Sequence, residues 1–110
     1  MRLTTHLALG TLLLLALCAC AAYGQVQRTF VSGLGIDANP CSLIAPCRTI
    51  GQAISQTNAG GEVAVLDSAG YGAFTITQAV SIISPPGVYA GISVFSGNGI
   101  TINAGAARFP

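Results

Sequence analysis

The fold is decided by residues 62–103, which read EVAVLDSAGYGAFTITQAVSIISPPGVYAGISVFSGNGITIN. This stretch contains five short β-prone runs, at 62–67, 73–77, 80–84, 91–96 and 99–103. In four of the runs apolar residues alternate with polar ones, mostly Thr, Ser or Asn, which is typical of half-buried strands. The glycine- and proline-rich connectors have turn chemistry, and most are too long for two-residue hairpins. Short strands of this kind are compatible with a sandwich, a barrel or a solenoid.

The residues before this stretch favour the solenoid. Residues 28–32 are predicted to form a short strand, and a turn-rich segment follows at 33–46. Thr49 with Gln52 fits a capping box, and the apolar spacing that follows predicts a helix of two to three turns, ended by glycines at 60–61. Solenoids require capping elements at their ends, so a helix with one apolar face in this place indicates an N-terminal cap.

Equivalent strand starts give an expected repeat length. Val63 to Val80 is 17 residues, Phe74 to Ile92 is 18, and Val80 to Ile100 is 20. Residues 62–110 therefore supply about two rungs, whereas a repeat array needs about three repeats and a cap at each end. We expect a truncated gene product, or the N-terminal piece of a longer ancestor; the alternative is an intact module that stacks on a partner.

Residues 1–24 have the layout of a secretory signal peptide, which we expect to be helical. A positive charge stands near the start, residues 7–22 are uncharged and apolar, and small residues follow. We expect cleavage between Gly24 and Gln25; cleavage two or three residues earlier is an alternative. A lipoprotein signal, with Cys20 as the lipidated N-terminus, is a second interpretation. An uncleaved membrane anchor is a third, although the apolar run is short for a span.

Charge is scarce in the remaining 86 residues, 25–110. Three arginines balance three carboxylates: Arg28, Arg48 and Arg108 against Asp37, Glu62 and Asp67. A net charge of zero gives no electrostatic case for binding nucleic acid or an anionic membrane surface. The high apolar content, 52% of the whole chain, makes disorder an unsuitable description.

Two cysteines remain after the leader, Cys41 and Cys47, six positions apart. Export places them in an oxidising compartment, so a disulfide is the expected state. A free or intermolecular thiol is the alternative. Two cysteines without histidine do not make a tetrahedral zinc site, so we expect no metal there.

Four segments of the chain, in this order, resemble a known protein family. They are Phe30-Val-Ser-Gly-Leu-Gly-Ile-Asp-Ala-Asn-Pro-Cys41, Ala45-Pro-Cys-Arg-Thr-Ile-Gly-Gln-Ala-Ile54, Gly60-Gly-Glu-Val-Ala-Val-Leu-Asp67 and Gly70-Tyr-Gly-Ala-Phe-Thr-Ile76. Over residues 28–84 the chain resembles the N-terminal end of right-handed parallel β-helix proteins of the pectin-lyase-like superfamily. Cys41 stands where that family usually has glycine, and Cys47 where it has an aromatic residue. We infer that a disulfide replaces a packing contact in the cap.

The resemblance implies an all-β chain: a right-handed parallel β-helix (solenoid) fragment with an N-terminal capping α-helix, preceded by the signal-peptide helix. The expected divisions are a signal peptide at 1–24, the strand, disulfide turn and capping helix at 25–61, and about two rungs at 62–110. The parent protein would bind or degrade polysaccharide. Lyases of this superfamily carry their calcium-binding acidic cluster and their base on middle rungs, which this chain does not reach.

The residues themselves argue against catalysis by this chain alone. Residues 25–110 contain no histidine or lysine, so the commonest general bases are absent. Asp37, Glu62 and Asp67 are interpreted as turn and strand-end residues, and Arg48 as a solvated flank. Tyr71, Tyr89 and Phe95 could stack on sugar rings if exposed, with Tyr71 and Tyr89 as the candidate glycan contacts, although core or turn packing is the favoured interpretation of such aromatics.

We therefore expect a non-catalytic N-terminal portion of an exported β-helix protein, without cofactors. Its expected partner is an extracellular polysaccharide, and its location is secreted, periplasmic or at the cell surface, with lipid anchoring as the alternative. The second hypothesis is a cell-surface structural or interaction module that associates with itself through its open C-terminal rung. An enzyme active on its own, a lyase or glycoside hydrolase, comes third.

Overall fold

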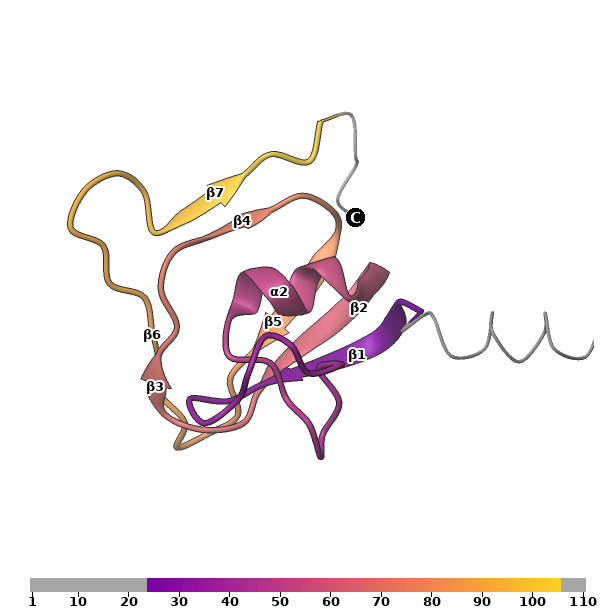
Figure 1. Ribbon diagram of the computed structural model, residues 1–110. Coiled ribbons are helices and arrows are strands. Elements are labelled where there is room, and N and C mark those ends of the chain that lie inside the picture. Colours follow the sequence, from indigo (N-terminus) through magenta and orange to yellow (C-terminus); the bar gives the residue numbers. More distant parts are fainter. Residues whose placement is uncertain (1–23, 106–110) are drawn as a thin grey trace, which may run out of the picture.

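The computed structural model describes residues 24–105, and most of its regular structure is strand (Figure 1). The elements in chain order are β1 (Val26–Val31), α2 (Ile50–Ser55), β2 (Thr57–Val65), β3 (Ala69–Gly70), β4 (Phe74–Ile76), β5 (Val80–Ile83), β6 (Ala90–Gly91) and β7 (Ile100–Ile102). The predicted signal-peptide helix, the alternative lipidation at Cys20 and the charge of Arg108 lie outside the described residues.

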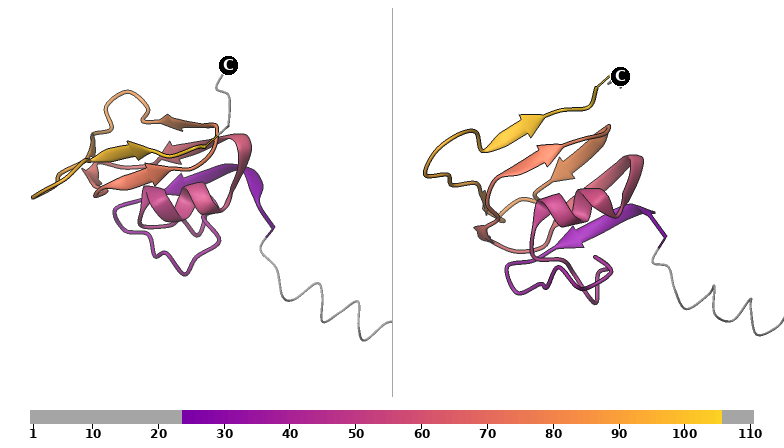
Figure 2. Two further views of the ribbon diagram at one scale, coloured as in Figure 1. Left: turned by 90° about the horizontal axis from the view of Figure 1, so that it is seen from above. Right: turned by 45° about the horizontal axis from the view of Figure 1, so that its top comes forward.

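The strands form three parallel sheets. The first contains β1, β2 and β5 in that order, the second β3 and β6, and the third β4 and β7. The chain thus visits the three sheets in the same order twice, as β2, β3, β4 and then as β5, β6, β7. Figure 1 shows the sheets on three sides of the molecule. Figure 2 shows the strands of successive passes stacked on one another, with α2 at the β1 end of the stack. The described strands are mostly parallel neighbours and close no barrel.

The pairing register differs from the expected repeat. Val63 pairs with Ile82, 19 residues later, rather than with Val80. Phe74 pairs with Ile100, 26 residues later, so the predicted equivalences of Phe74 with Ile92 and of Val80 with Ile100 are wrong. No strand is present between residues 92 and 99, so the strand predicted at 91–96 from its alternating pattern is a loop apart from Gly91.

Several element boundaries also differ from the predictions. The helix ends at Ser55 after six residues, and the expected stop at residues 58–61 is part of β2. The predicted division between residues 61 and 62 therefore falls inside a strand. β3 was not predicted, because a two-residue strand next to a glycine-rich turn has no periodicity to detect. Thr49 is the N-cap as predicted, and its side chain accepts a hydrogen bond from the Gln52 N–H.

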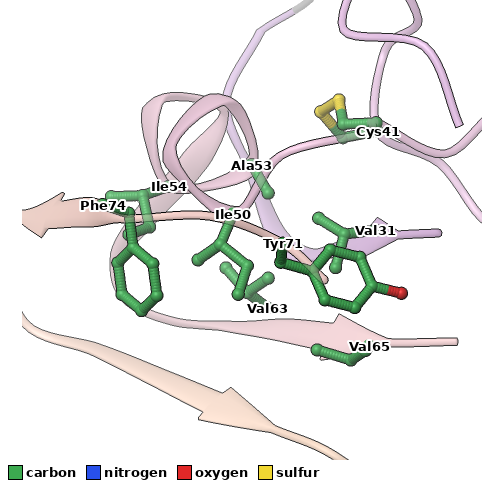
Figure 3. Close-up of a cluster of buried hydrophobic side chains, with 10 residues drawn as sticks. Val31, Cys41, Ile50, Ala53, Ile54, Val63, Val65, Tyr71 and Phe74 are labelled. Carbon is green, nitrogen blue, oxygen red and sulfur yellow. A yellow bond between two sulfur atoms is a disulfide. The ribbon is translucent and has the colours of Figure 1, made fainter. Parts of the chain in front are cut away.

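The core lies between α2 and the inward faces of the sheets (Figure 3). Side chains of both β1 and β2 enter it, and α2 contributes one apolar face. Its buried members are Val31, Cys41, Cys47, Ile50, Ala53, Ile54, Val63, Val65, Tyr71 and Phe74. The second pass of strands contributes only partly buried side chains, Val80, Ile82, Val88 and Ala90. Burial therefore decreases from the helix-covered end toward β7, whose three residues are all exposed.

The Cys41–Cys47 disulfide, which the sequence predicted, closes a loop against the outer edge of β1. The Phe30 N–H donates to the Cys41 carbonyl at 2.9 Å, and the Cys47 N–H donates to the Phe30 carbonyl at 3.0 Å. Unpaired strand edges promote association with other chains, so this loop protects β1. Cys41 has φ of 62°, a left-handed conformation that favours glycine. A glycine at this position would adopt the same conformation without strain.

Two buried threonines join β1 to β2 beneath the helix. The hydroxyls of Thr29 and Thr57 lie 2.8 Å apart, and both residues are fully buried. The Thr57 hydroxyl donates to the Ala53 carbonyl at 2.6 Å, whereas Thr29 lies 3.4 Å from the same oxygen. Thr57 is therefore the link between the helix end and the strand pair.

Replacing Thr57 by valine should lower the free energy of unfolding by about 1–3 kcal/mol, because the Thr29 hydroxyl loses its good partner in a buried place. The matched Thr29→Val change should cost less, since Thr57 keeps its bond to Ala53. The double variant should be no worse than Thr57→Val, because no unpaired hydroxyl remains. Urea unfolding of the exported chain measures all three. A double variant clearly less stable than Thr57→Val would contradict this account.

Candidate functional site

The side chain of Asp67 joins several groups by hydrogen bonds at the corner where β1 and β2 end. Its carboxylate accepts hydrogen bonds from the Gly33 N–H at 2.7 Å, from the Ser32 hydroxyl and from the Tyr71 hydroxyl at 2.7 Å. The Gly33 N–H, followed by the two hydroxyls, holds the pKa of Asp67 below its ordinary value. Burial, followed by the neighbouring Asp67 carboxylate, raises the pKa of Tyr71 to about 12. The pair is therefore an ionised carboxylate and a neutral phenol at neutral pH.

Asp37 plays a similar part at the start of the helix. Its carboxylate accepts from the Arg48 N–H at 2.9 Å, the Thr49 N–H at 2.9 Å and the Thr49 hydroxyl at 2.8 Å. Burial works against ionisation, but the bonds from Thr49 and Arg48 outweigh it, so the pKa of Asp37 is lowered. This residue was interpreted from the sequence as a turn residue. The structure adds that it ties that turn to the helix N-cap.

Arg48 is not simply a solvated flank. Its guanidinium donates to the Gly70 carbonyl at 2.8 Å and lies 5.4 Å from the centroid of the Tyr71 ring. It thus covers the lower edge of β3 and stacks on the ring that bonds Asp67. The last carboxylate, Glu62, forms an ion pair with Arg28 at 2.9 Å on the outer face of the first sheet.

The three carboxylates of the described residues therefore serve three separate structural contacts. A glycoside hydrolase needs two carboxyl groups facing each other across the scissile bond. Asp67 and Asp37 instead point to backbone N–H groups and hydroxyls, and Glu62 points to Arg28. Within residues 24–105 no group of three or more potential metal ligands of the His, Cys, Asp or Glu type comes together.

The two predicted glycan contacts lie in different environments. Tyr71 is 3% exposed and belongs to the core, so no face of its ring is available to a sugar (Figure 3). Tyr89 is 74% exposed and precedes β6. The packing interpretation thus holds for Tyr71, and Tyr89 is the candidate that the fold leaves open to solvent.

A cavity of about 420 Å³ lies between β1 and residues 40–43 of the disulfide loop. It is lined by Gly24, Val26, Arg28, Phe30, Pro40, Cys41, Ser42 and Leu43. Gly24 and Gln25, where cleavage is predicted, are exposed, and Gly24 forms part of this lining. Sequence reasoning missed this cavity, since only the return of the 40–43 segment to β1 creates it.

Comparison with known proteins gives no family. No protein-family model, no curated protein and no solved structure matches the chain. In the part of the chain that the structure describes, no helix has the length and apolarity to cross a membrane.

The Asp67 cluster predicts how stability responds to acid. A lowered folded-state pKa means that Asp67 and Asp37 stabilise the fold above about pH 4, their ordinary range, and that this stability is lost as the pH falls through their folded values. Asp67→Asn should cost about 1 kcal/mol at neutral pH, a small value because the site is partly exposed. The substitution should also make the free energy of unfolding fall less steeply as the pH is lowered, that is, flatten the acid limb of the stability curve.

Urea unfolding between about pH 2 and pH 7 tests this expectation. Glu62→Gln is the matched control, since Glu62 makes only a surface ion pair. An acid limb that is as steep in Asp67→Asn as in the unaltered chain would contradict the assignment.

Proposed function

We propose that residues 26–102 form the capped N-terminal end of a right-handed parallel β-helix, in an exported protein that binds or degrades polysaccharide. The cap itself performs no chemistry; it closes the core and supports the rungs that follow it. The proposal combines the family resemblance of residues 28–84 with the two passes of the chain through three parallel sheets.

The observation that carries the proposal is the difference between the two ends of the stack. The lower edge of β1 is covered by the disulfide loop, and α2 covers the core beside it. At the other end, Ile100 and Ile102 lie in register with Phe74 and Ile76 and so share their inward face. Yet Ile100 is 47% exposed and Ile102 66%. A further strand above β7 would bury both, as β7 itself stacks on β4.

Export is supported by the disulfide. Cys41 and Cys47 are both fully buried, and their Cα atoms are 4.6 Å apart. Such a bond persists in oxidising compartments and is rare in the cytosol. It agrees with the secretory leader expected at residues 1–24, and we propose a secreted, periplasmic or cell-surface location.

A polysaccharide partner is supported by the chemistry of the outer faces. Thr75 and Thr101 are paired and exposed on the third sheet, and Ser81 is exposed on the first. These hydroxyls can exchange hydrogen bonds with sugar hydroxyls without a charge. The carboxylates serve structural contacts, which is why the proposal assigns binding rather than catalysis to this part of the chain.

The second candidate is a module that associates with itself through the β7 end. One observation favours it: residues 68–105 contain no Asp, Glu, Lys, Arg or His. Proteins commonly use charges to prevent pairing of exposed strand edges, and none is present along β5, β6 or β7.

Expression of the full chain with export, followed by size-exclusion chromatography and circular dichroism of the secreted product, separates the two candidates. A folded monomer of low stability is the result expected for a cap that needs further rungs, since β7 leaves apolar side chains uncovered. A stable oligomer of defined size would support the module instead. Product formation from polygalacturonate by the purified chain would contradict the non-catalytic assignment.

A further inference from the structure

Tyr89 occupies an unusual place on the outer face of the second sheet. Its neighbours in the core, Val88 and Ala90, are both partly buried against the cluster, whereas Tyr89 is 74% exposed. Side chains alternate between the faces of a strand, so Tyr89 and Gly91 share the outer face. The two-stranded pairing then places Gly70 beside Gly91.

The Tyr89 ring lies against the backbone of Gly91. A Cβ added to Gly91 would stand 2.9 Å from Cε1 of the ring and 3.6 Å from its Cζ. Gly91 is consequently buried although it faces outward, while the paired Gly70 is exposed. Because Gly70 and Gly91 have no side chains, the outer face of the second sheet beside the Tyr89 ring carries only backbone atoms.

The backbone at Tyr89 is held on both sides. The Tyr89 N–H donates to the Ser68 hydroxyl at 2.8 Å, and the Tyr89 carbonyl accepts from the Ala69 N–H at 3.0 Å. Among the described residues no hydrogen bond engages the Tyr89 hydroxyl. The ring is thus positioned from β3 and β6 without being used by the core.

From this geometry we infer that Tyr89 is a stacking platform for a pyranose ring of a neutral polysaccharide. An aromatic ring supplies a large apolar surface with little conformational freedom to lose, and it suits the apolar face of a sugar. The glycan is neutral because residues 68–105 carry no ionisable side chain other than tyrosine. The nearest cation, Arg48, is turned toward the Gly70 carbonyl and the Tyr71 ring. This inference rests on the proposed polysaccharide-binding function and names its site and ligand class.

Gly91 gives the inference its sharpest test. Gly91→Ala retains Tyr89 but displaces the ring, because the new methyl group would meet Cε1. Tyr89→Ala removes the platform, and Tyr89→Phe retains it. Phe95→Ala is the matched control, since Phe95 is a fully exposed aromatic residue on the next loop.

Isothermal titration calorimetry of the exported chain with hydroxyethyl cellulose, a neutral glucan, and with polygalacturonate provides the readout. We expect binding of the neutral glucan that is independent of salt, and a loss of about tenfold or more in affinity for Tyr89→Ala and Gly91→Ala. Tyr89→Phe and Phe95→Ala should bind as the unaltered chain does. Circular dichroism of each variant establishes that the fold is retained.

The outcomes that overturn the inference are distinct from those that overturn the function. Glycan binding that Tyr89→Ala leaves intact, or binding of polygalacturonate alone, removes the platform while a polysaccharide-binding function stands. An unaltered chain that binds neither glycan removes both the platform and the polysaccharide binding assigned to this part of the chain.

Discussion

The structure depends on one constraint, the parallel, in-register stacking of β1, β2 and β5. Parallel pairing places a side chain directly above its partner, about 4.8 Å away, so inward residues form columns. Thr29, Val63 and Ile82 make one such column, and Val31 lies on Val65 in the next. The sheet can bury an inward side chain well only when neighbouring strands or α2 cover it, which is why Val63 and Val65 of β2 are buried and all three residues of β7 are exposed.

The two ends of this stack meet the constraint differently. At the β1 end, a disulfide loop fills the pairing positions of the strand edge, and two aspartates hold the loop and the helix start in place. At the β7 end, the described chain offers pairing positions and apolar side chains without a charge nearby. The two aspartates, which a search for catalytic residues would select, thus stabilise the β1 end. The surface features that suit a partner lie toward the β7 end.

Local chemistry allowed part of this structure to be predicted. The N-cap at Thr49 and the Cys41–Cys47 pair are short-range features, and both are present; the second bond of the predicted capping box is not formed, because the Thr49 N–H donates to Asp37. Register was not predictable in the same way, because connectors of unequal length hide which runs are equivalent. The hydrogen bonds of Asp67 were also missed: Ser32 is 35 residues from Asp67 in the sequence, and only the pairing of β1 with β2 brings it beside Asp67 and Tyr71. The sequence likewise could not distinguish the buried Tyr71 from the exposed Tyr89.

Cysteine cross-linking tests the stacking most directly. Thr75 and Thr101 are exposed partners in adjacent parallel strands, a spacing that a disulfide can bridge. The account predicts that Thr75→Cys with Thr101→Cys forms an intramolecular disulfide under mild oxidation without change in circular dichroism. The control, Thr75→Cys with Ser93→Cys, follows the register in which Phe74 would match Ile92, and it should remain reduced. Preferential cross-linking of the control pair would contradict the arrangement of the three sheets.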